Sequence, residues 1–261
     1  MRFGSQLYQL KLPVNPRQNR FFYPIYGQIQ IGGRIRFCHF TRLFRPNDQQ
    51  FRLLDFGCGN GNYGFVIASK HPQSRIDSYD SDQRKFPLLR KLKGKPDNLF
   101  FLSREDYSTL PEQSYDFILC IDVLEHIKDD VGTLKYLTGL LKPGGILFIH
   151  LPKNHLKRKG VLQDVSREEH DDHVRDEYIE SEILDLFGEV SSLKLLKLEY
   201  TFGFWGELAW EIDNILIRHS PKIRYLLFPI LYSMAWLDSR RKNRWGNGFF
   251  LIGQKVIGEN I

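Results

Sequence analysis

The sequence predicts an α/β protein built around a doubly wound, mostly parallel sheet. From residue 52 onward, short apolar runs alternate with segments of helical length. The runs are bounded by turn residues and are too short for helices, which indicates strands. Strands that are apolar throughout are buried on both faces, as happens when crossover helices cover a parallel sheet. A chain of 261 residues is long enough to bury such a core.

Strands and helices follow one another in a regular order up to residue 152. Strands are expected at residues 51–57, 75–80, 98–102, 115–122, 146–152, 193–202 and 247–256. Helices are expected at residues 61–71, 81–93, 131–142 and 179–188. Pro72 ends the first helix and Pro143-Gly144-Gly145 ends the third, because proline and glycine interrupt helices. A site is expected in the loops that follow the carboxyl ends of the strands.

The composition divides the chain into a core domain and two basic additions. Residues 51–202 together with 247–261 form the core domain. Residues 1–50 are an N-terminal extension rich in basic and aromatic residues, with a net charge of +7. Residues 203–246 are an insertion before the last strand, and they are also aromatic and basic. This asymmetry is typical of a protein that meets an anionic partner, although ordinary solvated surface also explains it.

The insertion contains an apolar stretch of 13 residues, 225–237, which is too short to cross a bilayer. Lysines and arginines flank it on both sides. Two interpretations are open: a helix lying on an anionic membrane surface, or a substrate lid or dimer surface packed onto the sheet. In the extension, Phe37, Phe40 and Phe44 have helical spacing, and we expect them to cover the binding pocket or to extend the core.

Cysteine usage and the N-terminus favour a cytoplasmic protein. Cys38, Cys58 and Cys120 are odd in number and follow neither disulfide nor metal-ligand spacing. The first residues lack the apolar stretch of a signal peptide. We therefore expect a cytoplasmic location, with peripheral contact to an anionic membrane left open, and no bound metal.

The segment from Asp55 to Gly64 places four glycines behind an apolar run. It fits a dinucleotide-binding fingerprint, and it also fits an acid followed by three alternate glycines. In both cases the glycines permit a tight turn, and the amides of the following helix face the ligand. A carboxylate in front of the turn is unfavourable beside the pyrophosphate of a nicotinamide cofactor. It is favourable beside the sulfonium and ammonium of S-adenosylmethionine, and the sequence therefore predicts S-adenosylmethionine.

A second acid supports a nucleoside-containing cofactor. Asp80 ends the second predicted strand, sixteen residues beyond Gly64. A carboxylate at this position can accept hydrogen bonds from both ribose hydroxyls. The alternative is that Asp80 caps the helix that follows.

With EDYSTLPEQSYDFILCIDVLEHI and LLKPGGILFI, the sequence resembles the class I S-adenosylmethionine-dependent methyltransferases. It is most similar to the branch that contains ubiquinone/menaquinone-type and polysaccharide-cluster enzymes. The resemblance runs from about Arg52 to about Leu151 and returns in HVRDEYIESEILDLFG. It implies a Rossmann-like, seven-stranded sheet of order 3-2-1-4-5-7-6 with the last strand antiparallel. It also implies methyl transfer, with S-adenosylhomocysteine as the product.

The resemblance also implies site residues. The glycine motif at the methionine end of the cofactor matches Asp55, Gly57, Gly59 and Gly61, with Cys58 inside the turn. The ribose-binding acid matches Asp80, with Ser81 beside it, and the step near the adenine matches Asp106 and Tyr107. The end of the fourth strand, which borders the methionine moiety, matches Ile121 and Asp122. Glu105 stands where the family usually has glycine, which puts the local backbone in doubt. Asp106 as an ordinary loop acid and Cys58 as a small turn residue are the plain alternatives.

Methyl transfer requires a positioned nucleophile and, for a hydroxyl acceptor, a group that removes its proton. We expect His126 to be such a group, and His173 or Arg175 to complete the acceptor site from the long polar segment 153–178. His150, His155 and His170 are further candidates, and each histidine is otherwise a structural or surface residue. Glu125-His126 also resembles a metal-ligand pair of some quinone-ring O-methyltransferases, but we expect a capping role.

The expected acceptor is a small molecule, a glycan or a lipid-linked compound, methylated on oxygen. An RNA methyltransferase is the alternative within the enzyme class. Nucleic acid is disfavoured because Asp122-Val123-Leu124-Glu125 stands where base-amino methyltransferases carry an Asn/Asp-Pro-Pro-aromatic motif. The alternative outside that class is a catalytically silent protein that keeps the cofactor pocket as a scaffold.

Overall fold

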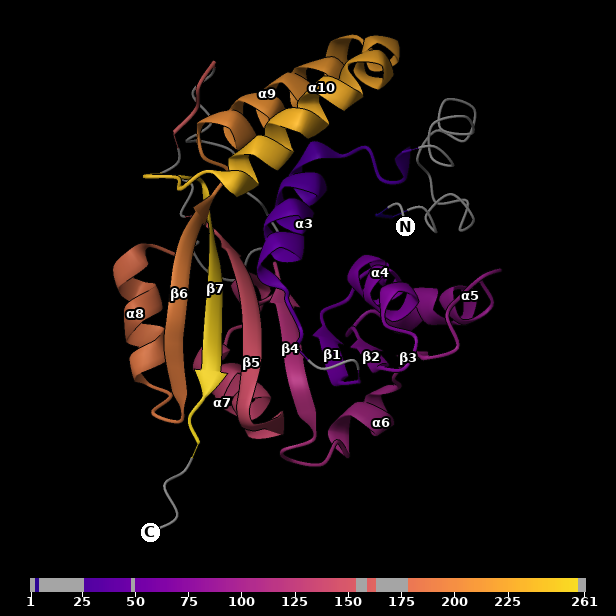
Figure 1. Cartoon of the computed structure of the whole chain (residues 1–261), viewed down its shortest axis with the longest axis vertical. Helices are drawn as coiled ribbons and strands as arrows, with labels where there is room; N and C mark the ends of the chain where they lie inside the picture. Colours follow the sequence, from indigo (N-terminus) through magenta and orange to yellow (C-terminus); the bar gives the residue numbers. More distant parts are fainter. Residues whose placement is uncertain (1–2, 5–25, 48–49, 154–158, 163–177, 258–261) are drawn as a thin grey trace.

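The computed structural model describes residues 3–4, 26–47, 50–153, 159–162 and 178–257, and these form a sheet covered by helices on both faces (Figure 1). The strands are β1 Arg52–Phe56, β2 Arg75–Tyr79, β3 Leu99–Phe101, β4 Tyr115–Ile121, β5 Leu141–Pro152, β6 Leu193–Thr201 and β7 Gly248–Lys255. Their order is β3-β2-β1-β4-β5-β7-β6. Strand β7 runs antiparallel to both of its neighbours, and the pairs from β3 to β5 are parallel. The expected fold class and strand order are confirmed.

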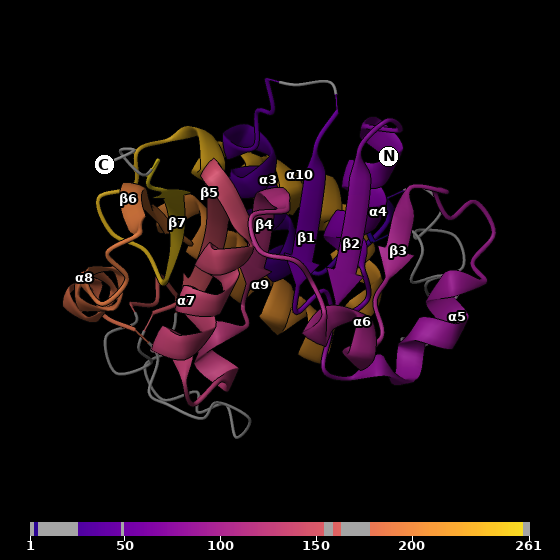
Figure 2. The same cartoon turned by 90° about the horizontal axis from the view of Figure 1, so that it is seen from below.

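Alternate residues of the central strands feed two apolar clusters, one on each face of the sheet. Leu54 and Ile118 belong to the cluster beneath α7 Asp130–Leu140 and α8 Glu180–Gly188. Leu53 and Leu119 belong to the cluster beneath α3 Ile31–Leu43, α4 Asn62–Lys70 and α5 Phe86–Arg90. Successive side chains of a strand point to opposite faces, so a strand in a sheet covered on both sides must be apolar throughout. Figure 2 shows the sheet between these layers.

Two element boundaries differ from those expected. The helix expected at residues 81–93 is a 3-10 turn, η2 Gln83–Lys85, followed by the short α5, and the side chain of Asp82 accepts the N–H of Arg84 at the start of the turn. Strand β5 begins at Leu141 and includes the Pro-Gly-Gly sequence, because Leu141 already pairs with Tyr115 before a shift in register. Turn residues end a helix, but an edge or bulge position accepts them within a strand.

The insertion forms a helical hairpin above the carboxyl ends of the parallel strands (Figure 1). Its helices are α9 Phe204–His219 and α10 Pro221–Arg240. Both pack with α3, forming a third apolar cluster that includes Ile31, Ala209 and Phe228. The hairpin therefore packs on the N-terminal helix and not on the sheet. No helix in the described part of the chain is long and apolar enough to cross a membrane.

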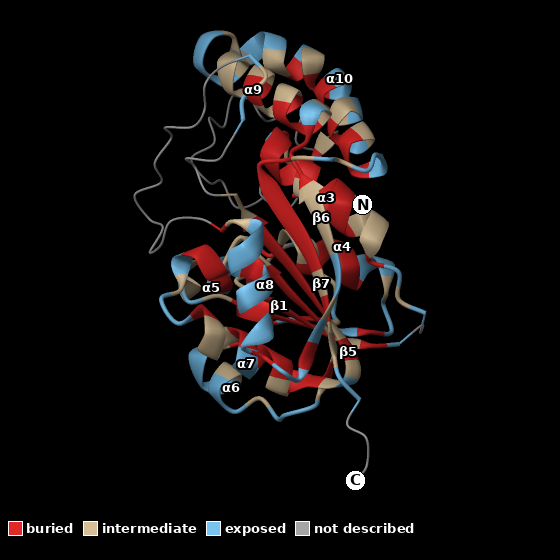
Figure 3. Cartoon of the chain, turned by 90° about the vertical axis from the view of Figure 1, so that its left-hand side faces the viewer, coloured by how far each residue is buried: buried red, intermediate tan, exposed pale blue. Residues whose placement is uncertain are grey.

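Helix α3 fixes the hairpin relative to the sheet. Phe37, Phe40 and Phe44 are buried, and Phe40 and Phe44 each contact Phe148 of β5. The three phenylalanines thus extend the core, one of the two expected roles. Because α3 packs on the sheet through one side and on the hairpin through another, α3 lies between the sheet and the hairpin (Figure 3).

Candidate active site

The glycine turn between β1 and α4 leaves one side of the backbone open. Gly57, Gly59 and Gly61 all have positive φ angles, of 71°, 53° and 70°. A Cβ atom on Gly57 would lie 2.2 Å from a methyl group of Val123, and one on Gly61 would lie 3.0 Å from the ring of Phe101. A Cβ on Gly59 would meet no atom within 4 Å. Gly57 and Gly61 are therefore required by packing, whereas the open side of Gly59 is available to a ligand.

Asp55 lies beneath this turn, at the end of β1. Its side chain is buried, and Oδ2 accepts the N–H of Gly64 at 3.2 Å. Burial raises the pKa of Asp55 to about 7, with a smaller contribution from the nearby charge of Asp80. Asp55 thus holds the first turn of α4 against β1, and its carboxyl group lies behind the backbone of the glycine turn.

Asp80 belongs to the same loop cluster. Its Oδ2 accepts the N–H of Gly59 at 2.7 Å, and its Oδ1 accepts the N–H of Asp82 at 2.8 Å. The N-cap of the following turn is Asp82, so Asp80 is not the capping residue. Asp80 is partly exposed and Ser81 is exposed. The structure thus brings the acid at the end of β2 to the glycine turn at the end of β1.

Asp106 and Tyr107 lie in α6 Arg104–Ser108, after β3. Asp106 forms a capping box with Ser103, whose N–H it accepts at 2.9 Å, and this contact lowers the pKa of Asp106. The ring of Tyr107 stacks on that of Tyr79 with centroids 3.8 Å apart. The helix begins at Arg104, so Glu105 lies in a helical turn that needs no glycine. The expected contact of Asp106 and Tyr107 with the adenine stays a prediction.

Asp122 follows Ile121 at the end of β4 and has a positive φ of 54°. Its carboxylate accepts Arg36 Nε of α3 at 2.7 Å and also accepts the Nδ1 proton of His150. Burial by itself would raise the pKa of Asp122, but the charge of Arg36 and the hydrogen bond from His150 lower it to about 2. Asp122 is therefore ionised and is held from two elements, α3 and β5.

His150 is a structural histidine within this network. A carboxylate can only accept, so Nδ1 carries the proton that is given to Asp122. Nε2 lies 2.9 Å from Thr201 Oγ1 of β6 and accepts the hydroxyl proton. The imidazole is buried, and burial lowers its pKa. With both nitrogens engaged, neutral His150 links β4, β5 and β6 and is not placed to act as a base.

The remaining candidate side chains differ in where they lie. His126 is exposed on the 3-10 turn η3 Leu124–His126, directly after β4, and its charge contributes to lowering the pKa of Asp122. His173 and Arg175 lie outside the described residues. Cys58 is buried, and burial raises the pKa of its thiol, so it is a small turn residue and not a nucleophile.

Sequence reasoning missed Arg36 and Thr201 as neighbours of the strand ends. The only signal for Arg36 was its place in the basic extension. Among the residues that can be described, no group of three or more His, Cys, Asp or Glu side chains is arranged to hold a metal ion.

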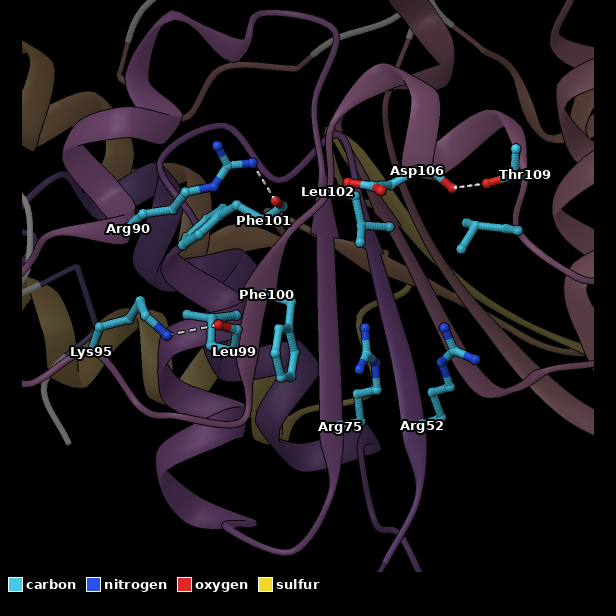
Figure 4. Close-up of a pocket in the computed structure, with 11 residues that line it drawn as sticks. Arg52, Arg75, Arg90, Lys95, Leu99, Phe100, Phe101, Leu102, Asp106 and Thr109 are labelled. Carbon is cyan, nitrogen blue, oxygen red and sulfur yellow. Dashed lines mark hydrogen bonds between the residues drawn. The ribbon is translucent and has the colours of Figure 1, made fainter.

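A surface hollow of about 440 Å³ lies beside β3 and α6, and no residue of the glycine turn lines it (Figure 4). Its four basic side chains are Arg52, Arg75, Arg90 and Lys95. Arg52 and Arg75 pair with the buried Asp77. Arg90 and Lys95 donate to the carbonyl oxygens of Phe101 and Leu99 in the edge strand β3. These cations neutralise a buried acid and cover a sheet edge, which are structural roles.

Comparison with known families identifies the domain. The sequence model of a family described as a methyltransferase domain matches residues 34–190. The chain belongs to the class I S-adenosylmethionine-dependent methyltransferases. This membership confirms the family and the cofactor expected from the sequence.

Two curated methyltransferases show how far the sequence similarity extends. The chain is 29% identical over 101 residues to a malonyl-(acyl-carrier protein) O-methyltransferase 2 of Ilyobacter polytropus, covering 39% of each chain. It is 31% identical over 110 residues to a trans-aconitate 2-methyltransferase of Escherichia coli, covering 42% of each. The chain thus spans about two fifths of the length of these relatives.

Solved methyltransferase structures share the fold over most of the chain. A phosphoethanolamine N-methyltransferase 2 of Haemonchus contortus, in complex with S-adenosylmethionine, has a TM-score of 0.58 at 18% identity, with 88% of this chain and 53% of that chain covered. The 4+2 cyclase SpnF has a TM-score of 0.56 at 19% identity, with 86% and 82% covered. Methyltransferases thus share this fold with a cyclase, so the fold alone does not assign the reaction.

Proposed function

We propose that this methyltransferase transfers the methyl group of S-adenosylmethionine to an oxygen atom of a small-molecule, glycan or lipid-linked acceptor. The observation that carries the proposal is the open side of Gly59 beside the carboxylate of Asp80. A cofactor lying along that side would contact the backbone of the turn, and its ribose hydroxyls would meet Asp80. In its ionised form, Asp55 behind the turn favours the cationic end of the donor.

The chemistry is a displacement at the methyl carbon. An acceptor oxygen forms a bond to this carbon, the carbon–sulfur bond breaks with its electron pair remaining on sulfur, and S-adenosylhomocysteine leaves. For a hydroxyl acceptor, a base takes the hydroxyl proton. We assign this role to His126, because it is exposed next to Asp122 at the end of β4. His173 and Arg175 are proposed to complete the acceptor site.

The names of the curated relatives support a small acceptor that is methylated on oxygen. One is an O-methyltransferase of a malonyl group, and another is a methyltransferase of trans-aconitate. An RNA acceptor has less support, because the described basic residues around β3 have structural partners and Asp122-Val123-Leu124-Glu125 lacks the Pro-Pro pair. We propose a cytoplasmic location.

The test is transfer of labelled methyl groups. The protein is incubated with methyl-labelled S-adenosylmethionine and a cell extract that is then separated into small polar, glycan, lipid and RNA pools. We expect label in one of the first three pools, and loss of that label with Asp80→Ala. Label confined to RNA would contradict the acceptor class. Tight cofactor binding with no labelled pool would favour the catalytically silent alternative.

A further inference from the structure

In the hairpin of α9 and α10, the acidic side chains are buried and the exposed charged side chains are basic. Four carboxylates of the hairpin, Glu207, Glu211, Asp213 and Asp238, are all buried. Asp213 pairs with Arg224 at 2.5 Å, and Glu211 accepts the N–H groups of Val161 and Leu162. Asp238 accepts the N–H of Gly206 at 3.1 Å and contacts His39 of α3. The acidic side chains of the hairpin therefore lie in its interior, where Glu211, Asp213 and Asp238 bind protein partners.

The exposed charges are all positive. Arg218 lies in the last turn of α9, Lys222 lies in the first turn of α10, and Arg240 ends α10, and each is exposed. Arg241, Lys242 and Arg244 follow directly and are exposed as well. The outward side of the hairpin therefore attracts anions along its whole length, and no described acid on it opposes this attraction.

Between these cations, the outer side of α10 is apolar. Ile223, Leu226 and Ile230 recur at helical spacing, with exposed fractions of 49%, 77% and 58%. Pro229 and Trp236 are also exposed, and Arg240 lies over the Trp236 ring at 5.2 Å. The opposite side of the helix, with Tyr225, Phe228, Leu231 and Ala235, packs on α9 and α3. Figure 3 shows exposed residues along the outside of the hairpin.

We propose that this outer side of α10, with its flanking cations, docks onto an anionic lipid bilayer. A convex apolar strip between clustered cations suits a helix that lies in the lipid interface, where apolar side chains enter the acyl region and lysine and arginine meet the headgroups. A second copy of the chain is a poorer occupant, because it would bring the same cations against one another. The inference goes beyond the proposed methyl transfer and does not depend on it.

The position of the hairpin links the surface to the site. The hairpin stands on α3, which carries Arg36, and Arg36 pairs with Asp122 at the carboxyl end of β4. The hairpin and the glycine turn both lie on the side of the sheet where the parallel strands end (Figure 1). Docking through α10 would therefore hold the strand ends near the membrane, where a lipid-linked acceptor is located.

The test is co-sedimentation of the full chain with vesicles, without acceptor or cofactor. One set contains only phosphatidylcholine, and the other contains about one third phosphatidylglycerol. We expect binding to the anionic vesicles, weaker binding at high salt, and little binding to the neutral ones. Leu226→Gln with Ile230→Gln should weaken binding more than tenfold, since burial of each side chain is lost. Lys222→Gln with Arg240→Gln should weaken it about 25-fold, at about fivefold per cation.

Matched controls keep the result interpretable. Leu184→Gln removes an exposed leucine from α8, and Arg84→Gln removes an exposed arginine beside α5, so neither should change vesicle binding. Unchanged thermal unfolding shows that each variant is folded. The inference is overturned if anionic vesicles do not bind, if the α10 variants bind as the wild type does, or if sedimentation velocity shows a dimer that the α10 variants dissociate. The vesicle result and the labelled-transfer result are independent, so either proposal can fail alone.

Discussion

Arg36 Nε of the N-terminal helix lies 2.7 Å from Asp122 Oδ2 at the end of β4. The pair ties the basic extension to the edge of the sheet where the cofactor turn lies. The same helix carries His39, whose Nε2 lies 3.1 Å from Asp238 of α10. Helix α3 therefore connects the strand ends with the insertion through an ion pair to Asp122 and a hydrogen bond to Asp238.

Removing the cation of this pair should destabilise the fold at neutral pH. Arg36→Gln leaves the Asp122 carboxylate with only His150, and we expect a loss of about 1–3 kcal/mol in the free energy of unfolding. The folded pKa of Asp122 is depressed to about 2, so its contribution is present above the unfolded value of about 4 and is lost as the pH falls through 2. Urea unfolding at pH 7 and pH 3.5 checks this, with a smaller difference expected at the lower pH. Arg84→Gln, at an exposed pair, is the control that should change nothing.

Alanine at Gly57 should mainly affect stability, and alanine at Gly59 should mainly affect cofactor affinity. Gly57→Ala drives a Cβ into Val123 and should lower the melting temperature strongly. Gly59→Ala meets no protein atom and costs only the left-handed conformation, about 1–2 kcal/mol. The new methyl group stands on the open side, so the affinity for S-adenosylmethionine should fall at least tenfold. Calorimetry on the folded Gly59→Ala protein decides this, and wild-type affinity would remove that side of the turn from the site.

Asp80 should matter for cofactor affinity far more than its neighbour. Asp80→Ala is expected to weaken S-adenosylmethionine binding by about 1–3 kcal/mol, because donors that the carboxylate satisfied are left without it. Asp82→Ala removes the cap of η2 and an exposed ion pair with Arg84, and it should leave the affinity unchanged. NAD should not bind to the wild type in the same calorimetric titration. Equal affinities of the two variants would argue against a ribose contact, and tight NAD binding would contradict the cofactor.

Asp55 should make stability depend on pH in a direction opposite to Asp122. Its folded pKa is raised to about 7 by burial, above the unfolded value of about 4. Its contribution is therefore fully present below pH 4 and is lost as the pH rises through 7. Asp55→Asn keeps an acceptor for the Gly64 N–H without the buried charge. Relative to wild type, its melting temperature should rise between pH 5 and pH 8, and a constant difference across that range would contradict the raised pKa.

His126 should affect turnover and not cofactor binding. If the acceptor is a hydroxyl, His126→Gln should lower kcat by about 10²–10⁴-fold, the range for a lost general base. The affinity for S-adenosylhomocysteine should remain that of the wild type. The measurement is the rate of labelled transfer to the identified acceptor as a function of pH. Full activity of the variant would show that the acceptor oxygen needs no base at this position.

The alternation of apolar runs and helical segments was enough to predict the seven strands. The reason is local: the central strands are buried on both faces, so consecutive residues such as Leu53 and Leu54 are both apolar. The tight turn was also predictable from the sequence, because Gly57 and Gly61 occupy positions where a side chain would crowd its neighbours. The strand order was available only through the resemblance, since hydropathy does not record which strands pair.

Other features were decided by tertiary structure alone. The sequence predicted that Pro143 and the two glycines after it end a helix. In the structure they belong to β5, because Leu141 pairs with Tyr115 of the neighbouring strand. His150 read as a possible base, but its partners Asp122 and Thr201 come from two other strands and make it structural. The basic extension and the apolar insertion read as separate additions, and packing on α3 joins them. Sequence by itself determined what each segment must bury, and the tertiary structure decided which distant charges meet, because those contacts follow from the arrangement of elements in space.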